Sequence, residues 1–155
     1  KEFEATRAKN EKQIVRSVAI EFRNHIMKAG LLPTTRFICK NSNSEVIQTN
    51  IPIKVTVASQ DCSESFEVSN GHLSFPDKIV KKLATVAGQY TMSLEPAAGQ
   101  TPFTCEPETF YITPAEMHKV SLRPDTPSIH CELGQTTSLE VQVHDKYNNS
   151  IDLQL

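Results

Sequence analysis

Two short stretches of alternating apolar and polar residues, 86 positions apart, constrain the fold of this chain more than any other feature. They are Ile53–Val57 and Leu139–Val143, and a polar turn precedes each of them. Strict alternation is typical of a half-buried β-strand. The spacing fits one seven-stranded β-sandwich plus a linker, so it predicts tandem repeats. The second copy is incomplete.

The predicted fold is therefore mainly β. We expect an Ig-like β-sandwich over residues 32–115, preceded by an N-terminal helix in residues 1–31, with residues 116–155 forming the incomplete start of a second Ig-like repeat. The helix is predicted because apolar residues recur at spacings of three and four, and because Gly30 and Pro33 give a stop signal. The residues of this apolar stripe are Ile14, Val15, Val18, Ala19, Phe22 and Ile26.

Period-two patterns predict the strands of the sandwich. The candidate strands are 36–40, 51–57, 88–94 and 103–112. Asn70-Gly71 lies between two alternating runs and predicts a hairpin. Lys78–Ala84 suits a helical turn or a crossover between sheets. The expected core residues are Ile53, Val55, Val57, Phe66, Val68, Phe75, Tyr90, Met92, Leu94 and Ile112.

Tyr90 allows two interpretations. A tyrosine that enters a late strand after a turn resembles a tyrosine corner, in which the hydroxyl binds nearby backbone. An ordinary half-buried strand tyrosine explains the same pattern equally well.

Charge is unevenly distributed along the chain. The net charge is −2, but residues 1–30 carry seven Lys and Arg against four acids, and the remainder carries nine against fourteen. An acidic sandwich is a poor ligand for a phosphate backbone. The candidate nucleic-acid contacts are therefore confined to the basic segment, at Lys9, Lys12, Arg16 and Arg23.

The cysteines indicate the redox environment. Cys39, Cys62, Cys105 and Cys131 could form two disulfides, but their spacing matches no zinc pattern, and the Trp of an antibody-type domain is missing. Free thiols in a reducing compartment are the favoured interpretation. An extracellular repeat, with disulfides and a glycan at Asn148, is the alternative.

Motifs for catalysis are lacking in the sequence. Asp145–Asn149 offers oxygen ligands for calcium, but a hairpin turn explains the same residues. We predict no enzyme activity, cofactor or metal, and no apolar run is long enough to span a membrane. The chain reads as a piece of a longer protein.

Three segments carry a family resemblance. Gly88–Leu94 and Val141–Asn149 look like strand signatures of Ig-like and filamin-like tandem repeats, and Ile112–Val120 looks like a linker between repeats. Together they resemble the middle region of the structural-maintenance-of-chromosomes flexible-hinge-domain-containing family. In that family an ATPase and a nucleic-acid-binding hinge flank the array, and the protein acts in chromatin compaction and gene silencing. No ATPase or hinge motif lies in this chain.

The resemblance implies a non-catalytic spacer and interaction module of a large nuclear protein. Its expected partners are other domains of the same polypeptide, with a homodimer possible. The alternatives are an extracellular adhesion or receptor repeat and a nucleic-acid contact through the basic N-terminal segment. The apolar residues after 116 must find cover, either on the first sandwich or on a second molecule. These residues are Val120, Leu122, Leu139, Val141 and Val143.

Overall fold

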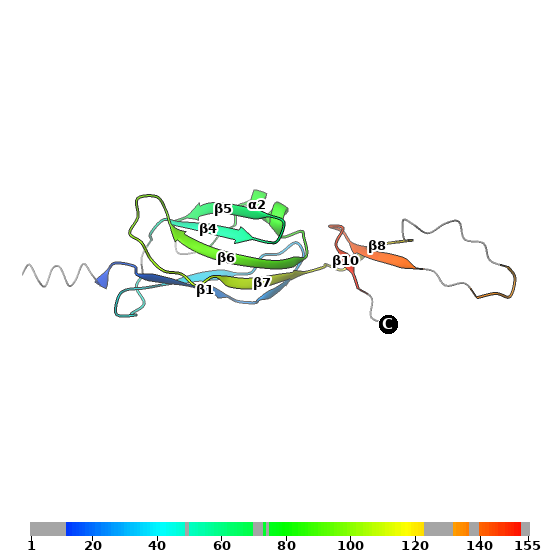
Figure 1. Ribbon diagram of the computed structural model, residues 1–155, viewed down its shortest axis with the longest axis horizontal. Helices are drawn as coiled ribbons and strands as arrows, with labels where there is room; N and C mark the ends of the chain where they lie inside the picture. The colour runs from blue at the N-terminus through cyan, green and yellow to red at the C-terminus, as the bar shows by residue number, and fades with distance from the viewer. Residues whose placement is uncertain are drawn as a thin grey trace, which may run out of the picture.

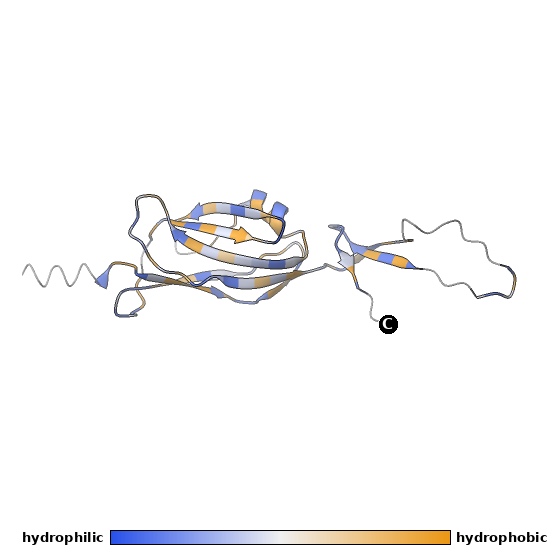
Figure 2. Ribbon diagram, viewed as in Figure 1, coloured by the Kyte–Doolittle hydropathy of each residue, from blue (hydrophilic) through white to orange (hydrophobic). Residues whose placement is uncertain are grey.

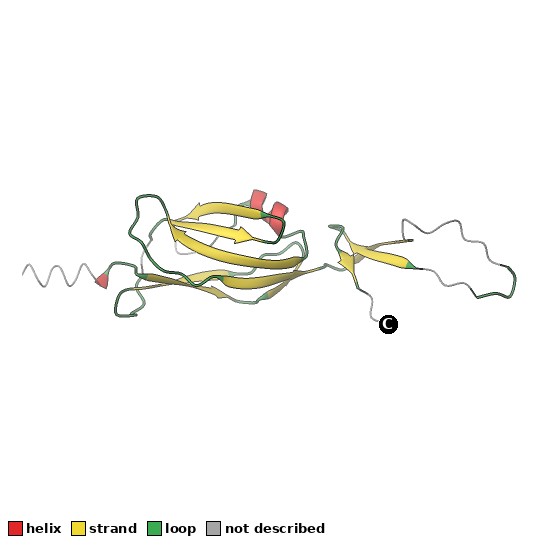
Figure 3. Cartoon of the chain, viewed as in Figure 1, coloured by secondary structure: helices red, strands yellow, loops and turns green. Residues whose placement is uncertain are grey.

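The computed structural model describes residues 12–48, 50–69, 73, 75–122, 132–136 and 140–152. The described chain is mainly β, as predicted, and Figure 3 shows strands as its dominant element. It forms two units, which we call the first unit (β1–β7 with helix α2) and the second unit (β8–β10). The second unit extends from one end of the first (Figure 1).

The first unit contains a five-stranded and a two-stranded sheet. The larger sheet has the order β2-β7-β6-β4-β5, and all neighbours are antiparallel except β2 and β7, which are parallel. The smaller sheet pairs β1 with β3 in antiparallel fashion. The strand bounds are β1 Ser17–Phe22, β2 Ile26–Lys28, β3 Thr35–Lys40, β4 Ile53–Ala58, β5 Ser63–Val68, β6 Gly88–Pro96 and β7 Glu108–Thr113.

The core lies between these two sheets. The inward side chains of β1 and β3 form one buried cluster with those of β4, β6 and β7. Aromatic rings join the layers, since Phe22 of β1 meets Phe110 of β7 edge to face at 5.3 Å between centroids. Within the larger sheet, Tyr90 stacks on Phe110 at 5.4 Å. Such pairs stabilise a core beyond their buried area.

Most predicted core residues are buried. Phe66, Val68 and Phe75 are only partly buried, although they pack against the core. The buried members are Ile53, Val55, Val57, Tyr90, Met92, Leu94 and Ile112. The sequence reading omitted Phe37, Leu83 and Phe110, which are also buried.

The predicted N-terminal helix is wrong over residues 17–28, which form β1 and β2 instead. Val18, Ile20 and Phe22 point into the core, whereas Ala19 and Glu21 are exposed, which is a period of two. Residues at 15, 18 and 22 satisfy helical spacing as well, so the backbone ladder to β3 decided between the two patterns. The segment is therefore built into the first unit and does not precede it.

Three further predictions concern the last strand, the Asn70-Gly71 hairpin and the helical turn after Pro76. The last strand begins at Glu108 and not at Phe103, because Thr104 only bridges Ser17 before the chain turns. The Asn70-Gly71 turn lies outside the described residues, and Leu73 and Phe75 after it lie in no strand. The helical turn is confirmed as α2, Asp77–Leu83, which follows Pro76 and buries Ile79 and Leu83.

The second unit is a three-stranded antiparallel sheet of order β10-β9-β8. Its strands are β8 Met117–Leu122, β9 Val141–Asp145 and β10 Ser150–Ile151. Leu139 lies outside the described residues and Glu140 precedes the strand, so the predicted strand is confirmed over Val141–Val143, which lies in β9.

The structural repeat has a different offset from the sequence pattern. β9 pairs with the first strand of its unit, as β3 does with β1, whereas β4 lies in the other sheet. After β3 the chain turns at Asn41 and Lys40 bridges Val46; after β9 it turns at Asp145 and His144 pairs with Ser150. The equivalence is therefore between β3 and β9, and the 86-residue match joined two strands of unlike position.

Candidate functional site: the junction between the two units

The junction consists of three segments: the corner Ala84–Ala87 after α2, the linker Pro114–Glu116, and the turn Asp145–Asn149. The corner is fixed from inside the first unit. The buried Tyr90 hydroxyl lies 2.9 Å from the Leu83 carbonyl oxygen and 2.6 Å from that of Val86, within donating distance of both. Since the last carbonyls of a helix lack partners within it, these bonds give the corner a defined shape.

Asn149 joins the second unit to this corner. Its Oδ1 accepts a hydrogen bond from the backbone N–H of Ala87 at 2.8 Å. Its Nδ2 donates to the carbonyl oxygen of Thr85, also at 2.8 Å. One amide thus uses both of its ends on the backbone of the other unit, which fixes its orientation as well as its position.

Asp145 holds Asn149 and the linker together. Its carboxylate is 2% exposed and accepts four hydrogen bonds. Oδ1 receives the backbone N–H groups of Tyr147 and Asn149, at 2.9 and 2.8 Å. Oδ2 receives the Ala115 N–H at 2.8 Å and the Asn149 Nδ2 at 2.9 Å. The Asp145 carboxylate therefore binds the turn, the linker and the Asn149 amide that contacts the corner.

The electrostatics of Asp145 follow from these contacts. Burial desolvates the carboxylate and raises its pKa, but the hydrogen bonds from Asn149, Ala115 and Tyr147 outweigh burial, and the net pKa lies below its ordinary value. The ionised form is therefore the one that the junction binds.

Tyr147 lies against Gly30 at the junction. Gly30, after β2, has a φ of +102°, and a Cβ built there would lie 2.5 Å from the Tyr147 hydroxyl oxygen. The N–H of Gly30 also donates to the Ala84 carbonyl at 2.7 Å. Gly30 is thus required twice, for its backbone conformation and for the space that it leaves to Tyr147.

The calcium interpretation of Asp145–Asn149 finds no support in this geometry. Calcium needs oxygen ligands with free lone pairs, and both Asp145 oxygens accept N–H donors. Among the described residues, no group of three or more His, Cys, Asp or Glu side chains is placed to hold a metal ion. The turn interpretation accounts for these residues.

The predicted nucleic-acid residues do not form a cluster in the described structure. Lys12, Arg16 and Arg23 are exposed, and Lys9 lies outside the described residues. Arg16 precedes β1 and Arg23 follows it, so a six-residue strand separates them by about 20 Å. The helical face that was expected to gather these side chains does not exist there.

The described cysteines are free. Cys39 is buried, Cys62 and Cys105 are partly buried, and Cys131 lies outside the described residues. Burial raises the pKa of the Cys39 and Cys105 thiols, which keeps them protonated and poorly nucleophilic. Cys39 is a small residue of the core, and Cys105 packs against that core.

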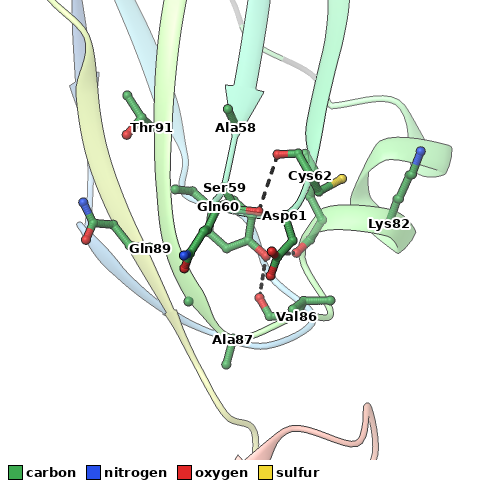
Figure 4. A pocket seen from close by; sticks show the side chains of 13 residues that line it. Ala58, Ser59, Gln60, Asp61, Cys62, Lys82, Val86, Ala87, Gln89 and Thr91 are labelled. Carbon is green, nitrogen blue, oxygen red and sulfur yellow. Dashed lines mark hydrogen bonds between the residues drawn. The ribbon is translucent and has the colours of Figure 1, made fainter.

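A pocket of about 540 Å³ lies beside the junction, between the β4–β5 turn and the start of β6 (Figure 4). Ser59, Asp61 and Cys62 line the turn side, where the Ser59 Oγ donates to the Cys62 carbonyl at 3.5 Å. Lys82 and Gln89 stand on opposite sides of it (Figure 4). Lys82 is paired with Glu64, which raises its pKa. The pocket supplies polar groups but no paired nucleophile and base.

The junction residues were only partly visible in the sequence. Asp145–Asn149 was recognised as a turn, but Thr85 and Ala87 were not connected with it, because 64 and 62 positions, respectively, separate them from Asn149. No family model matches this chain, and comparison with curated proteins and with solved structures gives no match. The described part of the chain contains no helix long and apolar enough to cross a membrane.

Proposed function

We propose that this chain is a non-catalytic spacer and interaction module made of Ig-like tandem repeats. The strand order β7-β6-β4-β5 supports the Ig-like assignment, because it corresponds to the GFCC′ sheet of a variable-type sandwich. The Tyr90 hydroxyl supports it further. It binds upstream backbone at the start of β6, which is where the tyrosine corner of such domains lies.

The observation that carries the spacer function is the double contact of Asn149 with Thr85 and Ala87. Units joined only by a linker rotate freely, whereas a bidentate amide and a buried carboxylate hold one orientation. The three-residue linker Pro114–Glu116 is itself bound, through the Ala115 N–H. An array built in this way sets the distance and the angle between the domains at its two ends.

We place this module in a large nuclear protein that organises chromatin or silences genes, and this part of the proposal rests on the family resemblance. The free state of Cys39, Cys62 and Cys105 agrees with a reducing compartment. The partners would be other domains of the same polypeptide, and the sandwich itself would not bind nucleic acid. The alternative is an extracellular adhesion or receptor repeat.

The spacer function is tested by freeing the second unit. Asn149→Ala in the intact chain removes both contacts with the corner, and Ser150→Ala, at the exposed neighbouring position, is the matched control. Residual dipolar couplings should report one common alignment for both units in the wild type and in the control. Two separate alignments are expected in the Asn149 variant. A common alignment that survives Asn149→Ala would remove the basis of the proposal.

The compartment is tested by thiol titration of protein isolated from its native source. Four reactive thiols in denaturant, and an unmodified Asn148, are expected for the intracellular module. Two disulfides, or a glycan at Asn148, would assign the chain to the extracellular class.

A further inference from the structure

The pocket beside the junction lies within the first unit and is lined by residues 58–62, 82–83 and 86–91. Its volume of about 540 Å³ is that of a ligand site. One wall is the turn between β4 and β5, and the other is the corner after α2 together with the start of β6. Figure 2 shows apolar and polar residues alternating along β4, which ends at the turn wall.

The pocket has a negative charge that no cation neutralises in the described structure. Its lining contains two charged residues, Asp61 and Lys82. The Lys82 ammonium forms an ion pair with Glu64 of β5, and in Figure 4 it points away from Asp61. Asp61 is exposed, and within the described part of the chain its carboxylate has no ion pair and no hydrogen bond. The pocket therefore attracts a cation and disfavours an anion.

Neutral hydrogen-bonding groups accompany this carboxylate on both walls. Ser59 and Gln60 lie beside Asp61 on the turn. Gln89 and Thr91 lie on β6, in the other wall. Amide and hydroxyl oxygens accept hydrogen bonds, and an ammonium or guanidinium group has donors only. One carboxylate with several neutral acceptors is the set of groups that such a cation needs.

The rest of the lining includes an apolar surface. Val86 is 55% exposed, and Ala58 and Ala87 belong to the two walls. A long basic side chain carries its charge at the end of an apolar stem, and that stem packs on apolar surface while the charge stays in contact with water. The lining of the pocket matches a group of this shape better than it matches a compact cation.

We propose that this pocket binds a lysine or arginine side chain of a partner protein. The cationic head lies at Asp61, and the stem lies on Val86. The volume exceeds that of one side chain, so part of the partner's backbone enters with it. The inference rests on the interaction role proposed above and specifies its partner by charge. It requires no fixed angle between the two units, so binding here and the spacer role can fail independently of each other.

NMR titration of the intact chain tests the proposal. The probes are Nα-acetyl-lysine methylamide and Nα-acetyl-arginine methylamide, whose only charge is on the side chain. A single side chain binds weakly, so a Kd of about 1–10 mM is expected. The amide signals of Asp61 and Ala87, one from each wall, should shift. Nα-acetyl-norleucine methylamide has the stem of lysine without its charge and should cause no shift at the same concentrations.

Two variants test the role of the carboxylate. Asp61→Asn keeps the shape of the side chain and removes its charge, and it should weaken binding of both basic probes about fivefold or more. The fold should persist, because Asp61 is exposed and makes no printed contact within its own chain. Glu95→Gln removes an exposed carboxylate outside the pocket lining and should leave binding unchanged.

Four results would overturn the proposal. Shifts of equal size with the norleucine probe would show an apolar site. Equal weakening by Asp61→Asn and Glu95→Gln would show a general attraction to the acidic chain. Shifts with spermidine and with neither amino-acid probe would assign the pocket to free polyamines. No shift with any probe would show that the pocket binds no cation of this kind.

Discussion

Asn41 and Asp145 hold equivalent positions in two turns that lie 104 residues apart. Each accepts hydrogen bonds through Oδ1 from the N–H groups two and four residues later. Each turn has a left-handed residue at its fourth position, Ser44 with φ +61° and Asn148 with φ +69°. The two side chains differ in their other atom. Nδ2 of Asn41 donates to the Lys12 carbonyl at 3.2 Å, whereas Oδ2 of Asp145 accepts the Ala115 N–H. The segment that enters each unit presents a carbonyl at Lys12 and an N–H at Ala115. The first requires the amide donor of Asn41, and the second requires the carboxylate acceptor of Asp145.

Exchanging these two side chains should destabilise both units. Asp145→Asn presents an NH₂ group to the N–H of Ala115, and Asn41→Asp presents a buried carboxylate oxygen to the carbonyl of Lys12. Each change leaves a buried polar group without a partner and should cost about 1–3 kcal/mol in the free energy of unfolding, measured by urea denaturation. Asn43→Asp and Asp152→Asn make the same exchanges at exposed positions and should cost far less. Equal effects at all four sites would contradict the proposed hydrogen-bond roles of Asn41 and Asp145.

The junction should loosen in acid. The pKa of Asp145 lies below its ordinary value of 3.8 in the folded chain, so its stabilisation is fully present above that value. It is lost as the pH falls through the ordinary value and then through the lowered one, because the unfolded chain then binds the proton first. Small-angle scattering of the wild type should therefore show a change in the arrangement of the units below about pH 4. Asp145→Asn should show no such step in this window.

The sequence predicted strands well where apolar residues alternate over a whole element. β4 and β6 are of this kind, since inward and outward residues differ in polarity at nearly every step. β1 was misread because the exposed Ala19 is apolar, which completed a helical stripe with Val15, Val18 and Phe22. Pairing with β3 determined the conformation of β1. Most paired residues are 15 or more positions apart in the sequence, so no local pattern indicates this contact.

The junction was beyond prediction for a related reason. Asn149 binds the backbone groups of Thr85 and Ala87. Since nearly every residue has a backbone carbonyl and N–H, the sequence does not indicate which ones a distant side chain binds. The turn itself was within reach, because Asn41–Glu45 and Asp145–Asn149 both begin with a residue that can cap its own turn. A comparison based on turn residues would have found the correct offset between the units.

Gly30→Ala should disturb the junction from the side of the first unit. Alanine is strained at a φ of +102°, and its Cβ would collide with the Tyr147 hydroxyl. The strain should lower the stability of the first unit by about 1 kcal/mol, and the collision should displace the turn. NMR shift changes at Asn149 measure that displacement. In a Tyr147→Ala background the strain should remain and the additional displacement should vanish; if it persists, the collision is not its cause.

Tyr90→Phe should lower the stability of the first unit without disturbing its core. The ring keeps its stacking on Phe110, but the carbonyls of Leu83 and Val86 lose the hydroxyl that they share. The expected loss is about 1–2 kcal/mol, since the Val86 carbonyl loses its bond to the hydroxyl and the Leu83 carbonyl keeps only the 3.4 Å hydrogen bond from the Val86 N–H. Tyr111→Phe, on the 46% exposed ring of β7, should leave the stability unchanged. Because the same corner presents Thr85 and Ala87 to Asn149, amide exchange at Ala87 should also quicken in Tyr90→Phe. Unchanged exchange there would show that the corner keeps its shape without the tyrosine.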